Sequence, residues 1–338
     1  MKKAFLFLTL LCVSTMIFAQ TETQTATLKH GDNITAYYGN NAFVNAHEAA
    51  VDGDIITLSS GSFVPTTITK AITLRGAGCM EDPELLTLPT SITGEIHARI
   101  AGENRHLTIE GIIFPDHFVF DSLYSPTFIR CSFEDLGYRQ ASNYIMTEAH
   151  FINCRIHDSW WGAANYTTFD NCIIWNVNNM NGDNTINMTF TANHSYIYTN
   201  SHIWRGNFND CVLVSCGDGW GWIGKFSVVN NCIGILNGAD FLYSEMTPNN
   251  SWTYDTFAEV FNFFNNEDFD WKTEQMTIRG DIAVLNPGSD GTEVGIHGGS
   301  LPYASRPTYM VPNKTTADHQ TTPDGKLNVH IDVIFEKK

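Results

Sequence analysis

A six-residue motif, Phe-x-x-Cys-x-Ile, recurs along the middle of the chain and restricts its fold more than any other feature of the sequence. Successive cysteines of the motif are separated by 23, 18, 39 and 21 residues, so the repeat is close to 20 residues long. The longest gap is twice this length and indicates two repeats, one of which has lost its cysteine. The copies begin at Phe128, Phe151, Phe169, Phe208 and Val229.

A repeat of about 20 residues with one short strand per motif predicts a solenoid, because a single unit cannot bury its own apolar face. Short strands separated by Gly, Asn, Asp and Pro, at a fixed period and without helices between them, favour a parallel β-helix over a sandwich or a barrel. The fold class predicted is therefore all-β. Asn193 and Ser201 are both candidates for the position of the missing cysteine, and the sequence does not choose between them.

The cysteines are predicted to form a column of small buried side chains inside the solenoid. Seven of the eight remain if the first 19 residues are removed, and an odd number cannot pair completely within one chain. Free cysteine packs well as a small hydrophobic residue. We therefore expect a mostly reduced ladder, although an exported chain would permit disulfides.

The first 19 residues are typical of a secretory signal peptide. Lys2 and Lys3 form a positive start, Ala4–Phe18 is apolar, and Ala19 is the small residue before a cleavage point. The sequence predicts a secreted, periplasmic or cell-surface protein with no membrane insertion, because no later stretch reaches about 18 apolar residues. The net charge of −17 excludes a nucleic acid as the partner, since phosphates require a basic surface.

The remaining chain divides into three regions. Residues 20–40 are a polar lead-in, and residues 41–300 form the predicted β-helix with a capping helix at its start. The helix is expected over residues 41–51, with Asn40 or Asn41 as its cap. The aromatic stretch 248–270 is expected to pack against the side or end of the solenoid. Residues 301–338 are a linker and a final strand that covers an open end or side, since exposed sheet edges promote aggregation.

The chain resembles the right-handed parallel β-helix (pectin-lyase-like) superfamily. The match is clearest from Ala42 to Phe63, continuing through Ile72-Thr-Leu-Arg-Gly76, and resembles the capping helix, Gly-Asp turn and first strand of pectin methylesterases. The segments 290–299 and 325–329 look like the endings of uncharacterised exported β-helix proteins of Bacteroidetes-type bacteria. The resemblance spans about residues 40 to 334 and implies the fold rather than one activity.

The catalytic motifs of related enzymes are present only as fragments. Asp240-Phe241 partly matches an element of pectin methylesterases, but Ser244 replaces the expected glycine. Asp183, Asp218 and His297-Gly298 occur in the order found in polygalacturonases, but the Asp-Asp pair and the Arg-x-Lys are missing. The sequence therefore leaves open whether the chain is an enzyme.

Strand alternation predicts where a site would lie. The cysteine and the residue two positions later face inward, so the residues one and three positions later face outward and align in rows between coils. Carboxylates beside histidine and arginine suit acid–base chemistry or the binding of a sugar acid, and aromatic rings suit sugar faces. An ordinary solvated surface remains the alternative. The predicted catalytic residues are Glu134, His157 and Asp158, and the predicted binding residues are Arg155, Trp175, Trp204 (if Ser201 is the rung), Arg205, Trp160, Trp161, Trp220 and Trp222.

No cofactor is predicted, because the histidines show no tight ligand spacing. A Ca²⁺ ion held by oxygens around Asp183 or Asp218 is the one alternative. The leading hypothesis is recognition of a polysaccharide or surface glycan along a lateral groove. The alternatives are a structural or adhesin-like surface protein without catalysis, and a polysaccharide lyase or glycoside hydrolase with an unrecognised active site. The sequence does not predict the oligomeric state.

Overall fold

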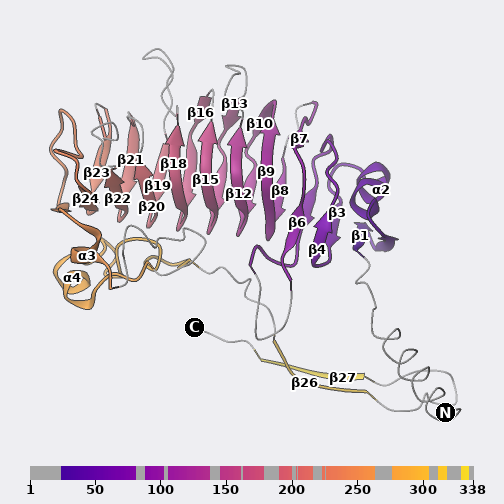
Figure 1. The fold of residues 1–338 in the computed structure, drawn as a ribbon. Coiled ribbons are helices and arrows are strands. Elements are labelled where there is room, and N and C mark those ends of the chain that lie inside the picture. The colour runs from indigo at the N-terminus through magenta and orange to yellow at the C-terminus, as the bar shows by residue number, and fades with distance from the viewer. Residues whose placement is uncertain are drawn as a thin grey trace, which may run out of the picture.

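The computed structural model describes residues 24–80, 88–102, 106–137, 145–160, 163–178, 190–199, 203, 205–215, 223–224, 226–262, 276–303, 311–317 and 329–334. These residues form an all-β parallel β-helix in which each coil stacks its strands on those of the preceding coil (Figure 1). The fold class predicted from the repeat is therefore confirmed.

Sheet 1 runs the length of the solenoid. Its strands are parallel from β3 onward, and β1 and β2 add an antiparallel hairpin at the N-terminal end. This hairpin lies in the region that was predicted only as a polar lead-in, residues 20–40. In spatial order sheet 1 contains β2 (Asn33–Tyr38), β1 (Thr25–His30), β3 (Ile55–Leu58), β5 (Thr73–Arg75), β8 (Thr108–Glu110), β11 (Thr127–Ile129), β14 (His150–Ile152), β17 (Thr167–Asp170), β19 (Phe190–Asn193), β21 (Gly206–Asn209) and β23 (Val228–Asn230).

Sheets 2 and 3 complete each coil. Sheet 3 contains β10 (Ser122–Tyr124), β13 (Ile145–Thr147) and β16 (Ala163–Asn165), and single bridges at Ile203, Ile223 and Tyr243 continue this pattern. Sheet 2 carries the predicted site residues Glu134, His157 and Trp175. It contains β25 (Trp252–Tyr254), β24 (Ile233–Ile235), β22 (Val212–Ser215), β20 (Tyr196–Thr199), β18 (Ile173–Asn178), β15 (Arg155–Trp160), β12 (Ser132–Gly137), β9 (Ile112–Phe120), β6 (Thr90–Ile92) and β4 (Gly61–Phe63), with β7 (Ile96–Ala98) paired to β9.

The interior of the solenoid consists of stacked equivalent side chains. The rings of Phe128 and Phe151 stack with centroids 4.7 Å apart, and those of Phe151 and Phe169 stack at 5.0 Å. All of these rings are fully buried. The phenylalanines of the motif therefore face the interior. Each stacked pair of rings contributes about 0.5–1.5 kcal/mol beyond the burial of its apolar area.

The cysteine column is also present. Cys131, Cys154, Cys172, Cys211 and Cys232 are buried and free, and each thiol lies within hydrogen-bond distance of the carbonyl two residues earlier. Burial is the main cause that raises the pKa of the Cys131, Cys154 and Cys232 thiols well above their ordinary value. The predicted column of small buried side chains is confirmed for these five residues.

The missing rung of the ladder is Ser195, so both predicted candidates, Asn193 and Ser201, were wrong. Tyr196 pairs with Ile173, which places Ser195 beside Cys172. The Ser195 hydroxyl accepts a hydrogen bond from the Cys172 amide at 3.0 Å and donates to the Asn193 carbonyl at 2.9 Å. Serine thus makes the same contacts as the cysteines.

The corner between sheets 1 and 2 explains why asparagine so often precedes the cysteine. The residue before each rung has a positive φ, between 43° and 55°. Asparagine and aspartate tolerate this left-handed conformation better than other residues with a side chain. The corner residues are Arg130, Asn153, Asn171, His194, Asp210, Asn231 and Asn250.

Helix α2 (Ala42–Ala49) lies at the N-terminal end of the solenoid, as predicted (Figure 1). Ala42, Phe43 and Ala46 are buried and belong to the same core as the coil interior. Asn41 is the N-cap residue, but its side chain makes no capping hydrogen bond. The helix therefore covers the first coil mainly through its apolar face.

The segment after β25 covers part of sheet 2 from outside. It includes α3 (Phe257–Val260), α4 (Gly280–Leu285) and the strap, which we define as residues 286–303. Their apolar side chains form a second core on the outer face of β18, β20, β22 and β24. The side chains of sheet 2 in this core are Ile173, Tyr196, Val212, Val214, Ile233 and Ile235, all of which are buried.

The strap is held by the corner residues. Asn171 donates hydrogen bonds from Nδ2 to the carbonyls of Ile296 and Gly298, at 2.9 and 2.8 Å. Asn153 donates to the Leu301 carbonyl at 3.2 Å, so the strap runs along this corner as far as β15. It therefore borders the outer face of sheet 2 in the middle of the solenoid.

The predicted C-terminal strand exists as β27 (Val329–Ile334), which pairs antiparallel with β26 (Val311–Ala317). Its covering role stays a prediction. Within the described residues, no helix is both long and apolar enough to span a bilayer.

Candidate functional site

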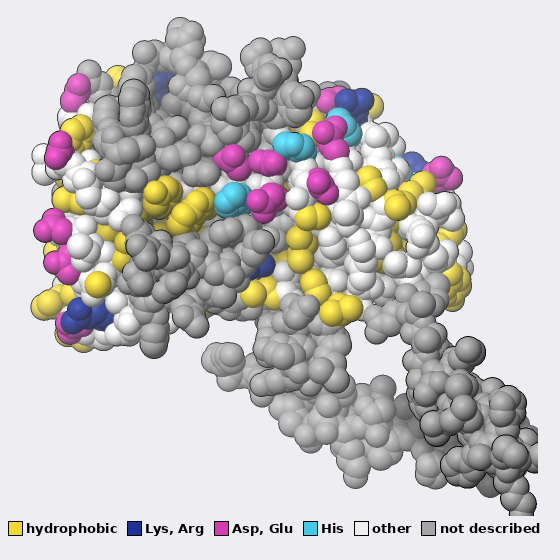
Figure 2. All heavy atoms as spheres, viewed as in Figure 1, with side chains coloured by type: hydrophobic (Ala, Val, Ile, Leu, Met, Phe, Trp, Pro, Cys, Tyr) yellow, Lys and Arg dark blue, Asp and Glu magenta, His cyan; other side chains and the backbone are white. Residues whose placement is uncertain are grey.

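Carboxylates and histidines gather on the outer face of sheet 2, over β9, β12 and β15 (Figure 2). They form two neighbouring rows that run across the strands. The first row contains Glu134, His157, Trp175 and Tyr198, and the second contains His117, Asp135 and Asp158. Neighbouring strands lie about 4.8 Å apart, so each row presents one side chain per coil at that spacing.

In the first row Glu134 and His157 form an ion pair if the histidine is protonated. The distance from Glu134 Oε1 to His157 Nδ1 is 3.0 Å, and the two side chains are 40% and 29% exposed. Both groups are therefore accessible to a ligand from solvent. The structure brings together two of the three predicted catalytic residues.

The second row contains another histidine–carboxylate pair. His117 Nδ1 lies 3.2 Å from Asp135 Oδ2, and Asp135 is in register with Asp158, the third predicted catalytic residue. The register between β9 and β12 shifts at Asp116, where β9 contains an additional residue opposite Glu134. This bulge adds the exposed carboxylate of Asp116, which accepts a hydrogen bond from the Gly94 amide, to the edge of the rows.

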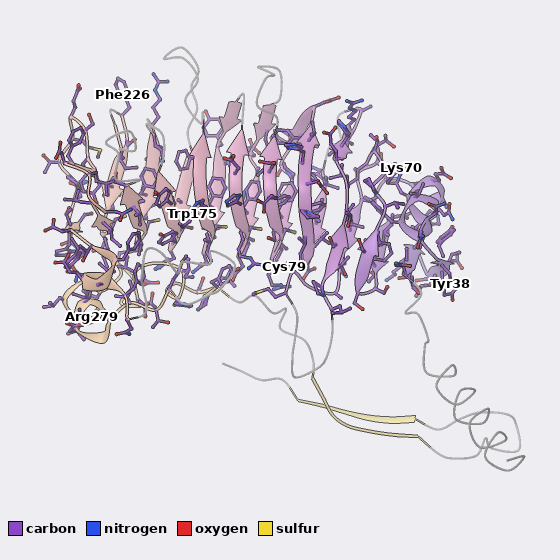
Figure 3. The ribbon with its side chains drawn as sticks, in the orientation of Figure 1. Tyr38, Lys70, Cys79, Trp175, Phe226 and Arg279 are labelled. Carbon is purple, nitrogen blue, oxygen red and sulfur yellow. The ribbon has the colours of Figure 1, made fainter. Side chains whose placement is uncertain are left out.

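The first row continues into an aromatic pair. The rings of Trp175 and Tyr198 are stacked, with centroids 4.5 Å apart and an interplanar angle of 9°, and both side chains are partly exposed. Trp175, which lies near the middle of the solenoid (Figure 3), follows His157 on the next strand, β18. Tyr198 occupies the place that the sequence analysis gave to Trp204, because that assignment required Ser201 as the rung. Trp204 itself lies outside the described residues.

Arg155 does not reach solvent. Its side chain belongs to the row next to Glu134 and His157, but only 4% of the residue is exposed. One guanidinium nitrogen donates to the Cys79 carbonyl at 3.2 Å. Arg155 therefore anchors the preceding segment at Cys79 and is not exposed to a ligand, contrary to the sequence prediction.

Arg205 lies on a different corner of the solenoid. It has a positive φ of 61° at the entry to β21 in sheet 1, whereas the two rows lie on sheet 2. Its guanidinium lies 5.2 Å from the ring centroid of Phe226, the equivalent corner residue of the next coil. The predicted grouping of Arg205 with Glu134 and His157 is therefore wrong.

The other predicted tryptophans cannot be placed. Trp160 is the last residue of β15, but its side chain is not described, and Trp161, Trp220 and Trp222 lie outside the described residues. Asp183 and Asp218, the candidate Ca²⁺ ligands, also lie outside them. Within the part of the chain that the structure describes, no group of three or more His, Cys, Asp or Glu is arranged to hold a metal ion.

The arrangement supplies three chemical capabilities. A histidine paired with a carboxylate can accept or donate a proton. Carboxylate oxygens accept hydrogen bonds from hydroxyl or ammonium groups, and charged acceptors make the stronger bonds. An exposed aromatic face packs against the apolar face of a ligand and attracts cations.

His117, Asp116 and Tyr198 were not predicted from the sequence as site residues. Pro115, which lies within β9, was the available indication of a bulge, because proline in sheets is confined to edge strands, strand starts and bulges. Tyr198 would have been found if serine had been considered equivalent to cysteine at the rung. Asp135, which pairs with His117, was also not assigned to the site.

No protein-family model and no curated protein matches this sequence. The two rows and their surroundings are therefore the features from which a function can be inferred.

Proposed function

We propose that this chain recognises an extracellular polysaccharide on the outer face of sheet 2. The observation that carries the proposal is the first row, in which Glu134 and His157 are followed by the stacked pair Trp175 and Tyr198. Polysaccharides present both apolar ring faces and hydroxyl groups, and this row offers a partner for each. The repeat of the coils suits a ligand that is itself a repeating chain.

The surroundings of the row support an open face. Farther along sheet 2 the equivalent positions, Val214 and Ile235, are buried beneath α3, α4 and the strap. The covering ends at Trp175 and Tyr198, which pack against the second core and remain partly exposed. A partly supported aromatic ring loses little conformational entropy when a ligand binds to it.

Binding can be tested by tryptophan fluorescence of the mature protein during titration with plant, host and bacterial glycans. At least one glycan should bind, and Trp175→Ala should weaken its binding by about tenfold, since an aromatic contact is worth on the order of 1 kcal/mol. Tyr38→Ala is the matched control, because Tyr38 is an exposed aromatic at the N-terminal hairpin, away from the rows (Figure 3). Binding of the variants should be measured by calorimetry.

The outcomes discriminate among the three hypotheses. Equal losses in Trp175→Ala and Tyr38→Ala, or an unchanged affinity in Trp175→Ala, would contradict recognition at this face. Absence of binding across the whole panel would favour the structural or adhesin-like role.

Cleavage of the bound glycan is the second candidate, and the specific observation in its favour is the accessible Glu134–His157 pair. A lyase or hydrolase needs a positioned acid or base within reach of its substrate. Release of reducing ends or unsaturated products, abolished in Glu134→Gln with binding retained, would establish an enzyme. Release that persists in this variant would place the chemistry elsewhere.

We also infer that the chain is exported and that it belongs to the pectin-lyase-like superfamily. The parallel β-helix, its capping helix α2 and the Thr73–Arg75 strand at the predicted place support the second inference. The charged and apolar pattern of residues 1–19 supports the first.

A further inference from the structure

We propose that two copies of this chain associate end to end, by pairing the outer edge of β2 with the same edge of a second copy. β2 is the terminal strand of sheet 1, and in the part of the chain that the structure describes only β1 pairs with it. Residues 33–36 and Tyr38 of this strand are exposed, and Tyr38 lies at the N-terminal end of the solenoid (Figure 3). The association does not depend on a glycan.

The edge of β2 lacks the features that usually prevent strands from pairing between molecules. These features are a short edge strand, a proline, a charged side chain or a bulge. β2 is six residues long, contains neither a charged residue nor a proline, and pairs with β1 in an unbroken register. Among the described residues, the other terminal strands of sheets 1, 2 and 3 are three residues long, and β26 contains Pro312, Lys314 and a bulge. β2 is therefore the edge best suited to accept a further strand.

The sequence of β2 is self-complementary in one antiparallel register. Directly opposite residues of an antiparallel pair point to the same face, so a two-fold axis at Ala36 would place Ile34 opposite Tyr38 of the second copy, twice. Ile34 and Tyr38 are 69% and 67% exposed. A β-branched residue opposite an aromatic residue stabilises a sheet. With the axis at Thr35, Tyr38 would instead face Asp32, so Ala36 is the better centre.

The same register brings opposite charges together at both ends of the pairing. Asp32, in the turn between β1 and β2, would lie opposite Asn40 of the second copy, next to the start of α2. α2 has no acidic residue in its first turn, and the side chain of its N-cap residue Asn41 makes no capping hydrogen bond. A helix N-terminus carries a partial positive charge and attracts carboxylates. Since Asp32 is exposed, the two symmetric contacts between Asp32 and α2 would stabilise the dimer.

The charge near β2 permits this association although the whole chain is acidic. A net charge of −17 opposes the approach of two copies in general. The pairing edge itself is uncharged, and the cationic Lys29 lies beside it on β1, opposite Ile34. Repulsion between the copies is therefore weaker at this end than their net charges suggest.

Sedimentation velocity of the mature protein over a range of concentrations measures the association. We expect a dimer with a dissociation constant on the order of micromolar. Ala36→Lys should raise this constant by about tenfold or more, because it places two ammonium groups opposite each other at the axis. Val228→Lys is the matched control and should leave the constant unchanged, since Val228 is an exposed residue of β23 at the other end of sheet 1. Asp32→Asn should raise the constant several-fold by weakening the contact with α2.

Disulfide formation tests the register. Ala36 would face its own copy, and opposite Cα atoms of an antiparallel pair lie about 4.5–5.5 Å apart, within the range of a disulfide. Ala36→Cys should therefore give a disulfide-linked dimer when oxidised glutathione accepts the two electrons. Ile34→Cys is the control and should stay unlinked, because the two copies of Ile34 would lie about 14 Å apart along the strands. The cysteines described in the native chain are buried and should not react. Circular dichroism of each variant confirms that the fold is retained.

Three results would overturn the inference. A monomer at every concentration would mean that β2 does not pair between copies and that another segment covers it or solvent does. A dimer that persists unchanged in Ala36→Lys, or that weakens equally in Val228→Lys, would place the association on another surface. Equal linkage of Ala36→Cys and Ile34→Cys would contradict a pairing centred on Ala36.

Discussion

The capping helix contains a histidine whose titration should control the acid stability of the protein. His47 of α2 is only 4% exposed, and its Nε2 atom accepts a hydrogen bond from the Thr69 amide at 3.2 Å. Burial and then the nearby Lys70 ammonium lower the pKa of His47 from its ordinary value of 6.5 to about 4. The folded protein therefore favours the neutral imidazole, which joins the helix to the first coil.

The sign of the effect follows from the lowered pKa. As the pH falls below 6.5, the unfolded chain binds a proton at His47 that the folded chain does not bind until about pH 4. The contribution of neutral His47 to folding stability is thus fully present above pH 6.5, and it is lost progressively as the pH falls from 6.5 to about 4. A tenfold change in proton affinity corresponds to about 1.4 kcal/mol, so the loss is about 3 kcal/mol. This is a large share of the roughly 5–15 kcal/mol that stabilise a typical domain.

Urea denaturation at a series of pH values measures this loss. Other groups titrate in the same range, so the comparison must be made with His47→Gln, whose side-chain oxygen can still accept from the Thr69 amide. The free energy of unfolding of the native protein should fall by about 3 kcal/mol more than that of the variant between pH 7.5 and pH 4. Parallel pH profiles for the two proteins would refute the reasoning.

Three further predictions concern the ladder and the second core. A thiol reagent at neutral pH should leave the five ladder cysteines unmodified in the folded protein and modify all of them in urea, because all five are fully buried when folded and burial also raises the pKa of the Cys131, Cys154 and Cys232 thiols. Ser195→Ala should cost about 1–3 kcal/mol by removing the acceptor of the buried Cys172 amide, whereas Ser195→Cys should cost less than about 1 kcal/mol; equal denaturation midpoints for the two variants would contradict the role given to Ser195. Ile233→Ala should cost about 2–5 kcal/mol if the covering segment packs on sheet 2, against less than about 0.5 kcal/mol for Val284→Ala, which is 81% exposed. A neutral Ile233→Ala would show that the second core does not form.

The fold could be predicted from the sequence because every coil of a solenoid must fill the same interior positions. Each coil must fill one inward position with an aromatic ring and another with a small residue, and Phe151 and Cys154 are one solution among several nearly identical ones. The period therefore survives in the sequence. Ser195 was not recognised as a rung because its coil also has Ala192 in place of the phenylalanine, so neither the Phe nor the Cys of the motif remains.

The candidate site was predictable only in part, because an outward side chain is not always an exposed one. Alternation correctly placed Glu134, His157 and Trp175 on one row. It could not show that distant segments bury Arg155 and Val214, since those contacts join residues far apart in the sequence. The prediction that Arg205 joins the row failed for a related reason, because the register depended on a rung that was assigned wrongly.

The corner residues show how one sequence position can serve both the coil and its covering. A positive φ is needed where the chain turns from sheet 1 to sheet 2, and this requirement favours asparagine at Asn153, Asn171 and Asn231. The same residues donate hydrogen bonds to carbonyls of the strap. Replacing asparagine by glycine at such a corner would satisfy the turn and remove the donor, whereas aspartate would retain the conformation and repel the carbonyl. The Asn-Cys pair therefore makes the turn recognisable in the sequence. Its second role, the docking of the strap, is visible only in the folded chain. Because the strap ends beside the open rows, this docking also fixes where the covered part of sheet 2 stops and where a ligand can begin.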